Sequence, residues 1–221
     1  MEEKTIHNFT GGDGANPRAG LCCSSKGAIG FLYGTAPWGG ASGAGTVFKL
    51  KNAAPYPLVW VYSFTGGVDG RGPWGGVVLD TAGNVYGTAT YGGANTKGTL
   101  FKLPQPPPPS PATPLYAFCS LAGCADGAFP SAAPSLNGSK LYGTAYDGGV
   151  ITEACAPNGC GTVYDFTLPA GPLVTHWAFT GPAGDGKNPS GIVTDPAFPG
   201  KWYGTTIAGG GAGLGVVFEV P

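Results

Sequence analysis

The sequence has 221 residues, a formal net charge of −1 and only 10% charged residues. This composition offers neither the basic stripe that binds nucleic acid nor the cationic amphipathic helix that lies on a membrane. No apolar run approaches the roughly twenty residues that a membrane-spanning helix needs, so we expect no insertion into a bilayer. The 42 glycines and 22 prolines disfavour helices and indicate an all-β fold.

One phrase recurs four times along the chain: Tyr-Gly-Thr, then a Gly-Gly pair, then a segment like Gly-Thr-Val-Phe. Each copy is preceded by an aromatic-x-Phe segment and by Asp-Gly-x-x-Pro, and successive Asp-Gly pairs are 56, 57 and 59 residues apart. Repeats of this period are typical of solenoids and propellers. The four copies of Tyr-Gly-Thr begin at Tyr33, Tyr86, Tyr142 and Tyr203.

Within each unit, four short β-type runs alternate with Gly, Pro, Asn and Asp turn signals. Four strands per unit is the make-up of a propeller blade, so we expect one blade from each unit. The second unit shows the pattern best. Its predicted strands are 77–79, 84–88, 99–103 and 115–118.

The two ends of the sequence match different strands of one blade. Residues 4–9 match the fourth strand of the other units, and residues 216–220 match the third. Pairing of these two runs would close the ring and remove exposed sheet edges, whereas a solenoid gains nothing from this order. The sequence therefore predicts one domain, residues 1–221: a four-bladed β-propeller of four repeats of about 55 residues, closed by the N-terminal strand completing the last blade.

The six cysteines are typical of an oxidising compartment, so we expect a secreted or extracellular protein, which we take to be a monomer. Two pairs each enclose four residues in loops of the third unit, which predicts two local disulfides. These pairs are Cys119 with Cys124 and Cys155 with Cys160. Cys22 and Cys23 are adjacent, so a strained vicinal disulfide and two buried thiols are both open at this point.

Strands in a blade alternate in direction, so the loops alternate between the two faces of the ring. The Asp-Gly-x-x-Pro loop and the Gly-Gly loop of each unit therefore emerge on the same face, and loops on a rigid scaffold often carry function. The residue just before Gly-Gly differs between the units. The four residues are Trp38, Tyr91, Asp147 and Ala208.

Several aromatic residues of these loops could form flat platforms for sugar rings or other planar ligands. Packing between neighbouring blades, in gaps that the glycines leave, is the alternative for each of them. If they bind a ligand, the carboxylate beside them would accept hydrogen bonds from it. The predicted ligand contacts are Trp38, Trp74, Tyr91, Tyr146 and Asp147.

Each unit also places one carboxylate in its Asp-Gly pair, and four carboxylates around a ring could hold a hard cation such as Ca²⁺. An Asp before Gly also favours a turn in which the carboxylate caps its own backbone, and we favour this structural role. We therefore expect no cofactor, with Ca²⁺ as the alternative. The four residues are Asp13, Asp69, Asp126 and Asp185.

The sequence carries few signals of catalysis. It has no Gly-x-Ser-x-Gly elbow and no glycine-rich loop ahead of a helix that would bind phosphate. Asp147 and Glu153 share the longest Gly-Gly loop, and most glycosidases work with a pair of carboxylates. These two residues are the catalytic candidates if the protein is a hydrolase or a lyase.

The segment Leu32–Leu50, with Leu-Tyr-Gly-Thr-x-x-x-Gly-Gly followed by Gly-Thr-Val-Phe-Lys-Leu, resembles the Gloeo-Verruco-type tandem repeat. The resemblance extends over essentially the whole chain and implies a secreted β-repeat protein, without catalytic residues to transfer. Two places depart from the pattern: Val216 replaces the Thr of the fourth unit, and the third unit has its cysteine-bearing loop. These departures suggest a specialised site there.

The leading functional hypothesis is a secreted propeller that binds a glycan, in the manner of a lectin, on the face of the Gly-Gly loops. One alternative is a carbohydrate-active or other small-molecule enzyme that works at the same face. The other is a structural extracellular protein without a small ligand. Loss of turnover without loss of binding, after removal of a carboxylate, would favour the enzyme.

Overall fold

The computed structural model describes residues 3–24, 30–105, 112–181, 185–195 and 200–220. Within these ranges the fold is all-β: fifteen strands form four antiparallel sheets, and the loops contain two short 3-10 helices. The two helices are η1, Ala122–Cys124, and η2, Glu153–Cys155. No helix of the described ranges is long and apolar enough to cross a membrane.

The first three sheets each contain four strands in chain order, as the sequence repeat predicts. The first sheet consists of β1 (Cys22–Ser24), β2 (Phe31–Ala36), β3 (Thr46–Lys51) and β4 (Leu58–Ser63). The second consists of β5 (Val78–Leu79), β6 (Val85–Ala89), β7 (Thr99–Leu103) and β8 (Thr113–Ala117). The third consists of β9 (Ser135–Asn137), β10 (Lys140–Ala145), β11 (Thr162–Thr167) and β12 (Leu173–Ala178).

The fourth sheet has three strands within the described residues. These are β13 (Gly186–Thr194), β14 (Trp202–Gly209) and β15 (Val217–Val220). Residues 4–9, which we expected to pair with β15, lie outside any strand. The described residues therefore form four sheets without a closed ring, and the closure of a propeller stays a prediction.

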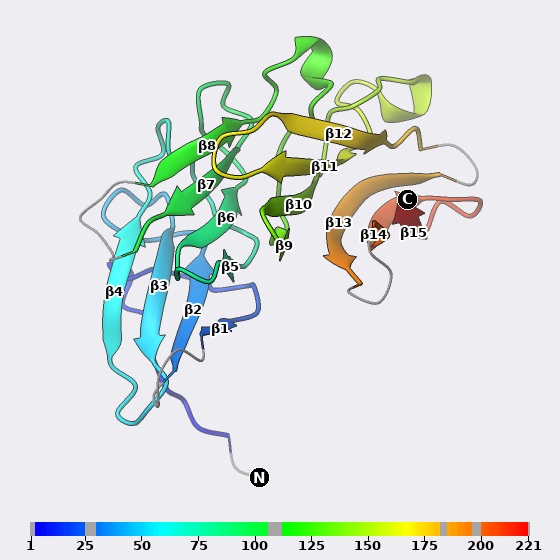
Figure 1. Ribbon diagram of the computed structural model, residues 1–221. Coiled ribbons are helices and arrows are strands. Elements are labelled where there is room, and N and C mark those ends of the chain that lie inside the picture. Colours follow the sequence, from blue (N-terminus) through cyan, green and yellow to red (C-terminus); the bar gives the residue numbers. More distant parts are fainter. Residues whose placement is uncertain (1–2, 25–29, 106–111, 182–184, 196–199, 221) are drawn as a thin grey trace.

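The four sheets fan out along an arc, with the first strand of each sheet toward the inside (Figure 1). Successive inner strands contact one another, β1 with β5, β5 with β9, and β9 with β13. Equivalent segments of all four units line a cavity of about 550 Å³ on this inner side. Each unit contributes a small residue, the second after the Pro of Asp-Gly-x-x-Pro: Ala19, Gly75, Ala132 and Gly191.

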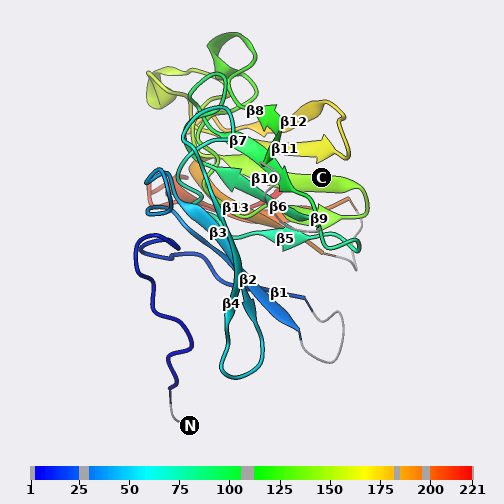
Figure 2. The same cartoon turned by 90° about the vertical axis from the view of Figure 1, so that its left-hand side faces the viewer.

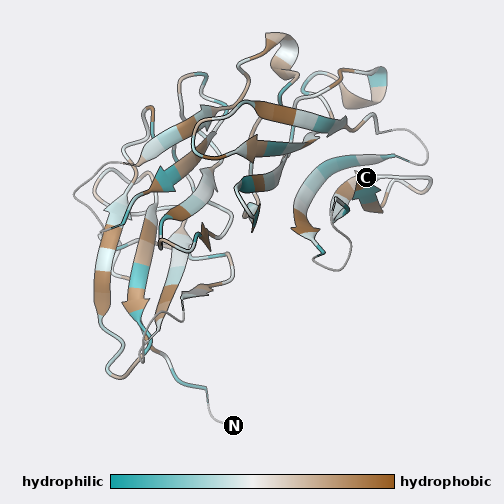
Figure 3. Cartoon of the chain, viewed as in Figure 1, coloured by the Kyte–Doolittle hydropathy of each residue, from teal (hydrophilic) through white to brown (hydrophobic). Residues whose placement is uncertain are grey.

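Three hydrophobic cores lie between successive sheets and hold the arc together. Hydrophobic and polar residues are interspersed along the strands (Figure 3), and the middle strands β3, β6 and β11 are buried along nearly their whole length. Each core joins residues of two sheets, so no sheet buries its apolar side chains alone. Representative pairs, in order, are Val47 and Phe101, Leu100 and Phe166, and Val163 and Trp202.

A repeated aromatic contact joins each aromatic-x-Phe segment to the unit that follows it. The Phe packs edge-on against the aromatic residue of the next Gly-Thr-Val-Phe segment, with ring centroids 5.0 to 5.1 Å apart. The Gly of Tyr-Gly-Thr lies against the same ring, since a Cβ at Gly87 would come within 2.6 Å of Phe101. Both residues therefore recur in every unit. The contacts are Phe9–Phe48, Phe64–Phe101, Phe118–Tyr164 and Phe179–Phe218.

Candidate ligand-binding site

The residue before each Gly-Gly pair lies beside the residue that follows Asp-Gly in its own unit. The two loops therefore emerge on one face, as the alternation of strand direction predicts. In Figure 2 the loops after β2 and β14 lie toward the left, whereas the turn between β11 and β12 lies toward the right. The paired residues are Ala15 with Trp38, Arg71 with Tyr91, Ala128 with Asp147, and Lys187 with Ala208.

A cavity of about 530 Å³ opens between the loops of the second and third units. Four of the five predicted ligand contacts line it: Trp74, Tyr91, Tyr146 and Asp147. The other lining residues are Thr90, Phe129, Ser131 and Ile207, the last from β14 of the fourth sheet. The structure thus brings together residues from three units that are far apart in the sequence.

The fifth predicted contact, Trp38, lines a smaller neighbouring cavity of about 200 Å³. Trp74 and Tyr91 belong to both cavities, so the two spaces share a wall. The Trp38 and Trp74 rings meet edge to face with centroids 5.1 Å apart. Trp38 and Tyr91 are 41% and 38% exposed, so part of each ring is open to a ligand.

Three cations lie over aromatic rings of the site, at 4.6 to 5.7 Å from the ring centres. Contacts of this kind are weakly stabilising and orient the cationic side chains. Ion pairs among the described residues involve other side chains, so these cations can donate hydrogen bonds to a ligand. The pairs are Arg18 over Trp74, Arg71 over Tyr91, and Lys97 over Phe129.

Asp147 supplies the carboxylate of the larger cavity. Its backbone exchanges two hydrogen bonds with Ala128, and its Oδ1 accepts a hydrogen bond of 3.1 Å from the side-chain amide of Asn188. Burial raises the pKa of the Asp147 carboxyl, against the opposing effects of the Asn188 hydrogen bond and of nearby Lys187 and Lys97. A half-buried acceptor of this kind suits the hydroxyl groups of a ligand.

The family model of the Gloeobacter/Verrucomicrobia repeat matches residues 2–154. The chain belongs to this family. The match confirms the resemblance seen in the Tyr-Gly-Thr and Gly-Thr-Val-Phe segments. The part of the candidate site from Trp38 to Asp147 lies inside the matched Gloeobacter/Verrucomicrobia region, whereas Asn188 and Ile207 follow it.

Comparison with curated proteins found no match. Among solved structures, the chain is similar to CoXyl43, a GH43 β-xylosidase/α-arabinofuranosidase from a compost microbial metagenome, in complex with xylotriose and in calcium-free form. That similarity has 15% identity and a TM-score of 0.45, and it covers 94% of this chain and 72% of CoXyl43. A GH43 β-1,3-galactosidase gives 14% identity and a TM-score of 0.48, with 90% of this chain covering only 41% of the galactosidase. At these values neither similarity assigns a fold or a function to the family member described here.

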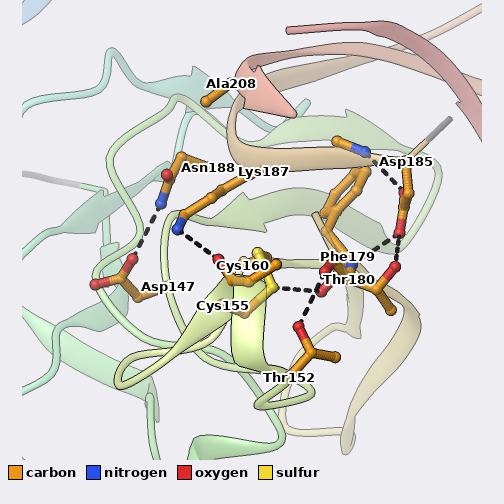
Figure 4. Close-up of a disulfide and its surroundings, with 12 residues drawn as sticks. Asp147, Thr152, Cys155, Cys160, Phe179, Thr180, Asp185, Lys187, Asn188 and Ala208 are labelled. Carbon is orange, nitrogen blue, oxygen red and sulfur yellow. Dashed lines mark hydrogen bonds between the residues drawn. A yellow bond between two sulfur atoms is a disulfide. The ribbon is translucent and has the colours of Figure 1, made fainter. Parts of the chain in front are cut away.

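The predicted disulfide Cys155–Cys160 is present within the third Gly-Gly loop, and both cysteines are buried in the core between the third and fourth sheets. Lys187 Nζ of the fourth sheet donates a hydrogen bond of 3.1 Å to the carbonyl oxygen of Ala154, which directly precedes Cys155 (Figure 4). The next residue of the fourth sheet is Asn188, whose amide donates to Asp147. The disulfide loop also bonds to the backbone next to Asp147, since the Gly148 N–H donates to the carbonyl oxygen of Asn158 at 2.7 Å.

The second predicted disulfide, Cys119–Cys124, is also present, in the Asp-Gly loop of the third unit. Cys22 lies on β1, where it is half-buried and packs against the core between the first two sheets. The side chain of Cys23 lies outside the described residues. The predicted pairing of these two adjacent cysteines is therefore not tested.

Each of the four Asp-Gly carboxylates accepts hydrogen bonds from its own loop, which is the structural role that we favoured. Asp69, for example, accepts hydrogen bonds of 2.8 Å from the Thr65 backbone N–H and from the Tyr62 hydroxyl. Among the described residues, no three His, Cys, Asp or Glu side chains gather in a way that could hold a metal. The equivalent partners are Thr10 and His7 for Asp13, Ser120 and Tyr116 for Asp126, and Thr180 and Trp177 for Asp185.

Only one of the two catalytic candidates lines the larger cavity. Asp147 lines the larger cavity, whereas Glu153 is exposed at the start of η2 and is not among the residues that line it.

Sequence reasoning missed Phe129, which lines the cavity beside Tyr91 with ring centroids 5.7 Å apart. One sequence signal could have found Phe129. The residue before the Pro of Asp-Gly-x-x-Pro is Phe in the third unit but Asn or Gly in the other three.

Proposed function

We propose that this chain is a secreted glycan-binding protein whose site is the cavity of about 530 Å³ between the second and third units. The observation that carries this proposal is the cavity wall: four aromatic rings line the same cavity as one half-buried carboxylate. A sugar ring has an apolar face and a polar edge, so it is matched by aromatic surfaces next to hydrogen-bonding groups. The four rings are Trp74, Tyr91, Phe129 and Tyr146.

The hydrogen-bonding groups of the cavity complement the hydroxyl groups of a sugar. Asp147 accepts, while Lys97 and Arg71 on the rim can donate. The neighbouring cavity that contains Trp38 could accommodate a second sugar unit, because Trp74 and Tyr91 form a wall common to both spaces. The arrangement favours a chain of at least two sugar units over a single monosaccharide.

Secretion is supported by the two disulfides, since such bonds persist in oxidising compartments. We further infer that residues 1–221 form one monomeric domain and that residues 4–9 complete the fourth sheet, which would close a four-bladed propeller. Phe9 and His7 support this inference, because they already make the contacts that the fourth strands of the other units make with the following unit. Val217 on β15 is 80% exposed, as expected if β15 is an edge strand to which a further strand can pair.

Binding can be tested with a glycan array, followed by titration of xylotriose, cellotriose and chitotriose. Trp74→Ala and Tyr91→Ala should each weaken the Kd of a bound trisaccharide at least tenfold, which corresponds to about 1.4 kcal/mol. Trp177→Ala is the matched control, because Trp177 is an exposed tryptophan on β12 outside both cavities. Unchanged affinity in both site variants, or no glycan bound by the unaltered protein, would contradict the proposal.

A carbohydrate-active enzyme at the same cavity is the second candidate, because burial raises the pKa of Asp147 as it does in many general acids. Most glycosidases need a second carboxyl group, which the described lining of the cavity does not include. Hydrolysis of a polysaccharide that disappears in Asp147→Asn, with trisaccharide binding retained, would favour this candidate. Calcium dependence is checked in the same titrations with EDTA, and we expect no change in Kd.

A further inference from the structure

Phe129 occupies a backbone position that the other three units fill with Asn or Gly. This position is the residue before the Pro of Asp-Gly-x-x-Pro, and its φ is positive in every unit. Asn and Gly tolerate this left-handed region, whereas a bulky side chain with φ above zero is an outlier. The four residues are Asn16 (φ 53°), Gly72 (φ 66°), Phe129 (φ 57°) and Asn188 (φ 58°).

The backbone contacts of this position do not require an aromatic side chain. The N–H of Phe129 donates to the carbonyl oxygen of Lys97 at 2.8 Å, across the boundary between two units. The equivalent bonds of Gly72 to Ala44 and of Asn188 to Cys160 are also 2.8 Å long. Any residue that accepts the left-handed conformation can therefore hold this junction together.

The ring of Phe129 does not complete a core either. It is half-buried, and it belongs to none of the three hydrophobic cores between the sheets. Its neighbours are the Tyr91 ring, with an interplanar angle of 61°, and the ammonium of Lys97, 4.6 Å from the ring centre. Both neighbours belong to the candidate site, and the ring itself lines the larger cavity.

We propose that Phe129 is a ligand-contacting residue. The backbone conformation at this position favours Asn or Gly, and the aromatic ring is present because it adds a binding surface to the cavity. This inference rests on the proposed glycan-binding function and assigns binding, rather than folding, as the role of one ring of that site. With Tyr91, the ring forms a corner of two aromatic surfaces inclined at 61°, so the apolar face of a sugar unit that stacks on one ring can also contact the other. The third unit is thereby specialised, since the other units have no aromatic residue at this position.

The test is Phe129→Asn, which installs the residue that the first and fourth units carry. We expect the thermal midpoint to stay the same or rise, because the backbone strain is relieved, and the Kd for xylotriose, cellotriose or chitotriose to weaken at least tenfold. Phe129→Tyr keeps the ring and should bind within about twofold of the unaltered protein, a change of roughly 0.4 kcal/mol at most. An unchanged or higher thermal midpoint together with a weaker trisaccharide affinity in Phe129→Asn is the result that supports the proposal.

Two results would overturn it. A fall in the thermal midpoint of Phe129→Asn as large as that of Phe118→Ala would show that the ring serves the fold. Unchanged trisaccharide affinity in Phe129→Asn, while Trp74→Ala weakens binding, would show that the site works without this ring. If the unaltered protein binds none of the three trisaccharides, the proposed function fails with this inference, whereas the thermal comparison still reports whether Phe129 is needed for folding.

Discussion

The junctions between the first three sheets and the junction to the fourth sheet contain the same repeated residues but are bonded differently. Across the first junction the Thr35 hydroxyl donates to the carbonyl oxygen of Gly75 at 2.9 Å, and across the second Thr88 donates to Ala132 at the same distance. At the third junction the equivalent hydroxyl, on Thr144, is buried and has no hydrogen-bond partner in the part of the chain that the structure describes. A repeated sequence has therefore not produced a repeated contact.

The cause lies in the inner strand of the fourth sheet. β13 is nine residues long, whereas β5 and β9 have two and three residues. In β13 the Asp-Gly-x-x-Pro segment pairs directly with β14, with a shift of register between Pro189 and Gly191. The segment that would accept a bond from the third unit is thus paired within its own sheet. Each unit specifies its own strands, but a junction also depends on the first strand of the unit that follows.

The largest effect is expected at the aromatic contacts that join the units. Phe118 is fully buried against Tyr164, so Phe118→Ala should lower the free energy of unfolding by about 3–5 kcal/mol. If residues 4–9 complete the fourth sheet, Phe9→Ala should cost nearly as much, because Phe9 would then be equally enclosed. Urea unfolding measures both. A loss below about 1 kcal/mol at Phe9, which is an ordinary surface value, would mean that the first and fourth sheets do not join.

The two disulfides of the third unit allow a further comparison, because only Cys155–Cys160 lies in the core at the junction with the fourth sheet. Both close loops of the same length, so chain entropy alone predicts a loss of about 2 kcal/mol when either pair is replaced by alanine. Cys155–Cys160 is buried and closes the loop whose Asn158 accepts a hydrogen bond from Gly148, next to Asp147, so its removal should cost more and should also weaken trisaccharide binding. Removal of Cys119–Cys124 should leave binding unchanged. Equal effects of the two double variants on binding would argue against a role of the disulfide loop in shaping the cavity.

The threonine hydroxyls offer a matched pair for the next test. Thr88→Val removes a buried hydrogen bond to Ala132 and leaves its carbonyl oxygen unpaired, so we expect a loss of about 1–2 kcal/mol in unfolding free energy. Thr144→Val removes a buried hydroxyl without a described partner and should be neutral or slightly stabilising. Thermal and urea unfolding of the two variants decide the point. An equal loss in both would mean that the third junction is bonded like the first two in solution.

The repeat predicted the strands well because glycine and proline mark the turns, and aromatic residues mark the strands, through the conformation of their own stretch of chain. Four-stranded sheets, the common face of the two loops and both disulfides of the third unit follow from neighbours in the sequence. The predicted contacts around Tyr91 also came together, since their loops share a face. Phe129 and Ile207 were missed because their part in the cavity depends on how adjacent units pack. The length of β13 was missed because the fourth unit has the same Asp-Gly-x-x-Pro motif as the other units, where this motif lies outside the named strands.

The smallest effect is a difference in pH dependence between two carboxylates of the third unit. Burial raises the pKa of Asp165, but hydrogen bonds of 2.8 Å from Lys140 and His176 outweigh burial and leave the pKa below its ordinary value. Its contribution to stability is therefore fully present above the unfolded pKa of about 3.9 and is lost as the pH falls through the folded pKa. Asp165→Asn should destabilise the protein at pH near 7, and the difference should shrink in acid.

Asp147 should behave in the opposite way. Its pKa is raised by burial, so the folded state binds more protons than the unfolded state between the two pKa values, and stability falls as the pH rises through that window. Asp147→Asn should therefore be as stable as the unaltered protein in acid, and equally or more stable near neutral pH. Urea midpoints measured from about pH 3 to pH 7 compare both variants, across the range in which carboxyl groups titrate. If both lost stability at neutral pH, Asp147 would be a structural ion-pair partner like Asp165, and its place in the cavity would not mark it as a binding group.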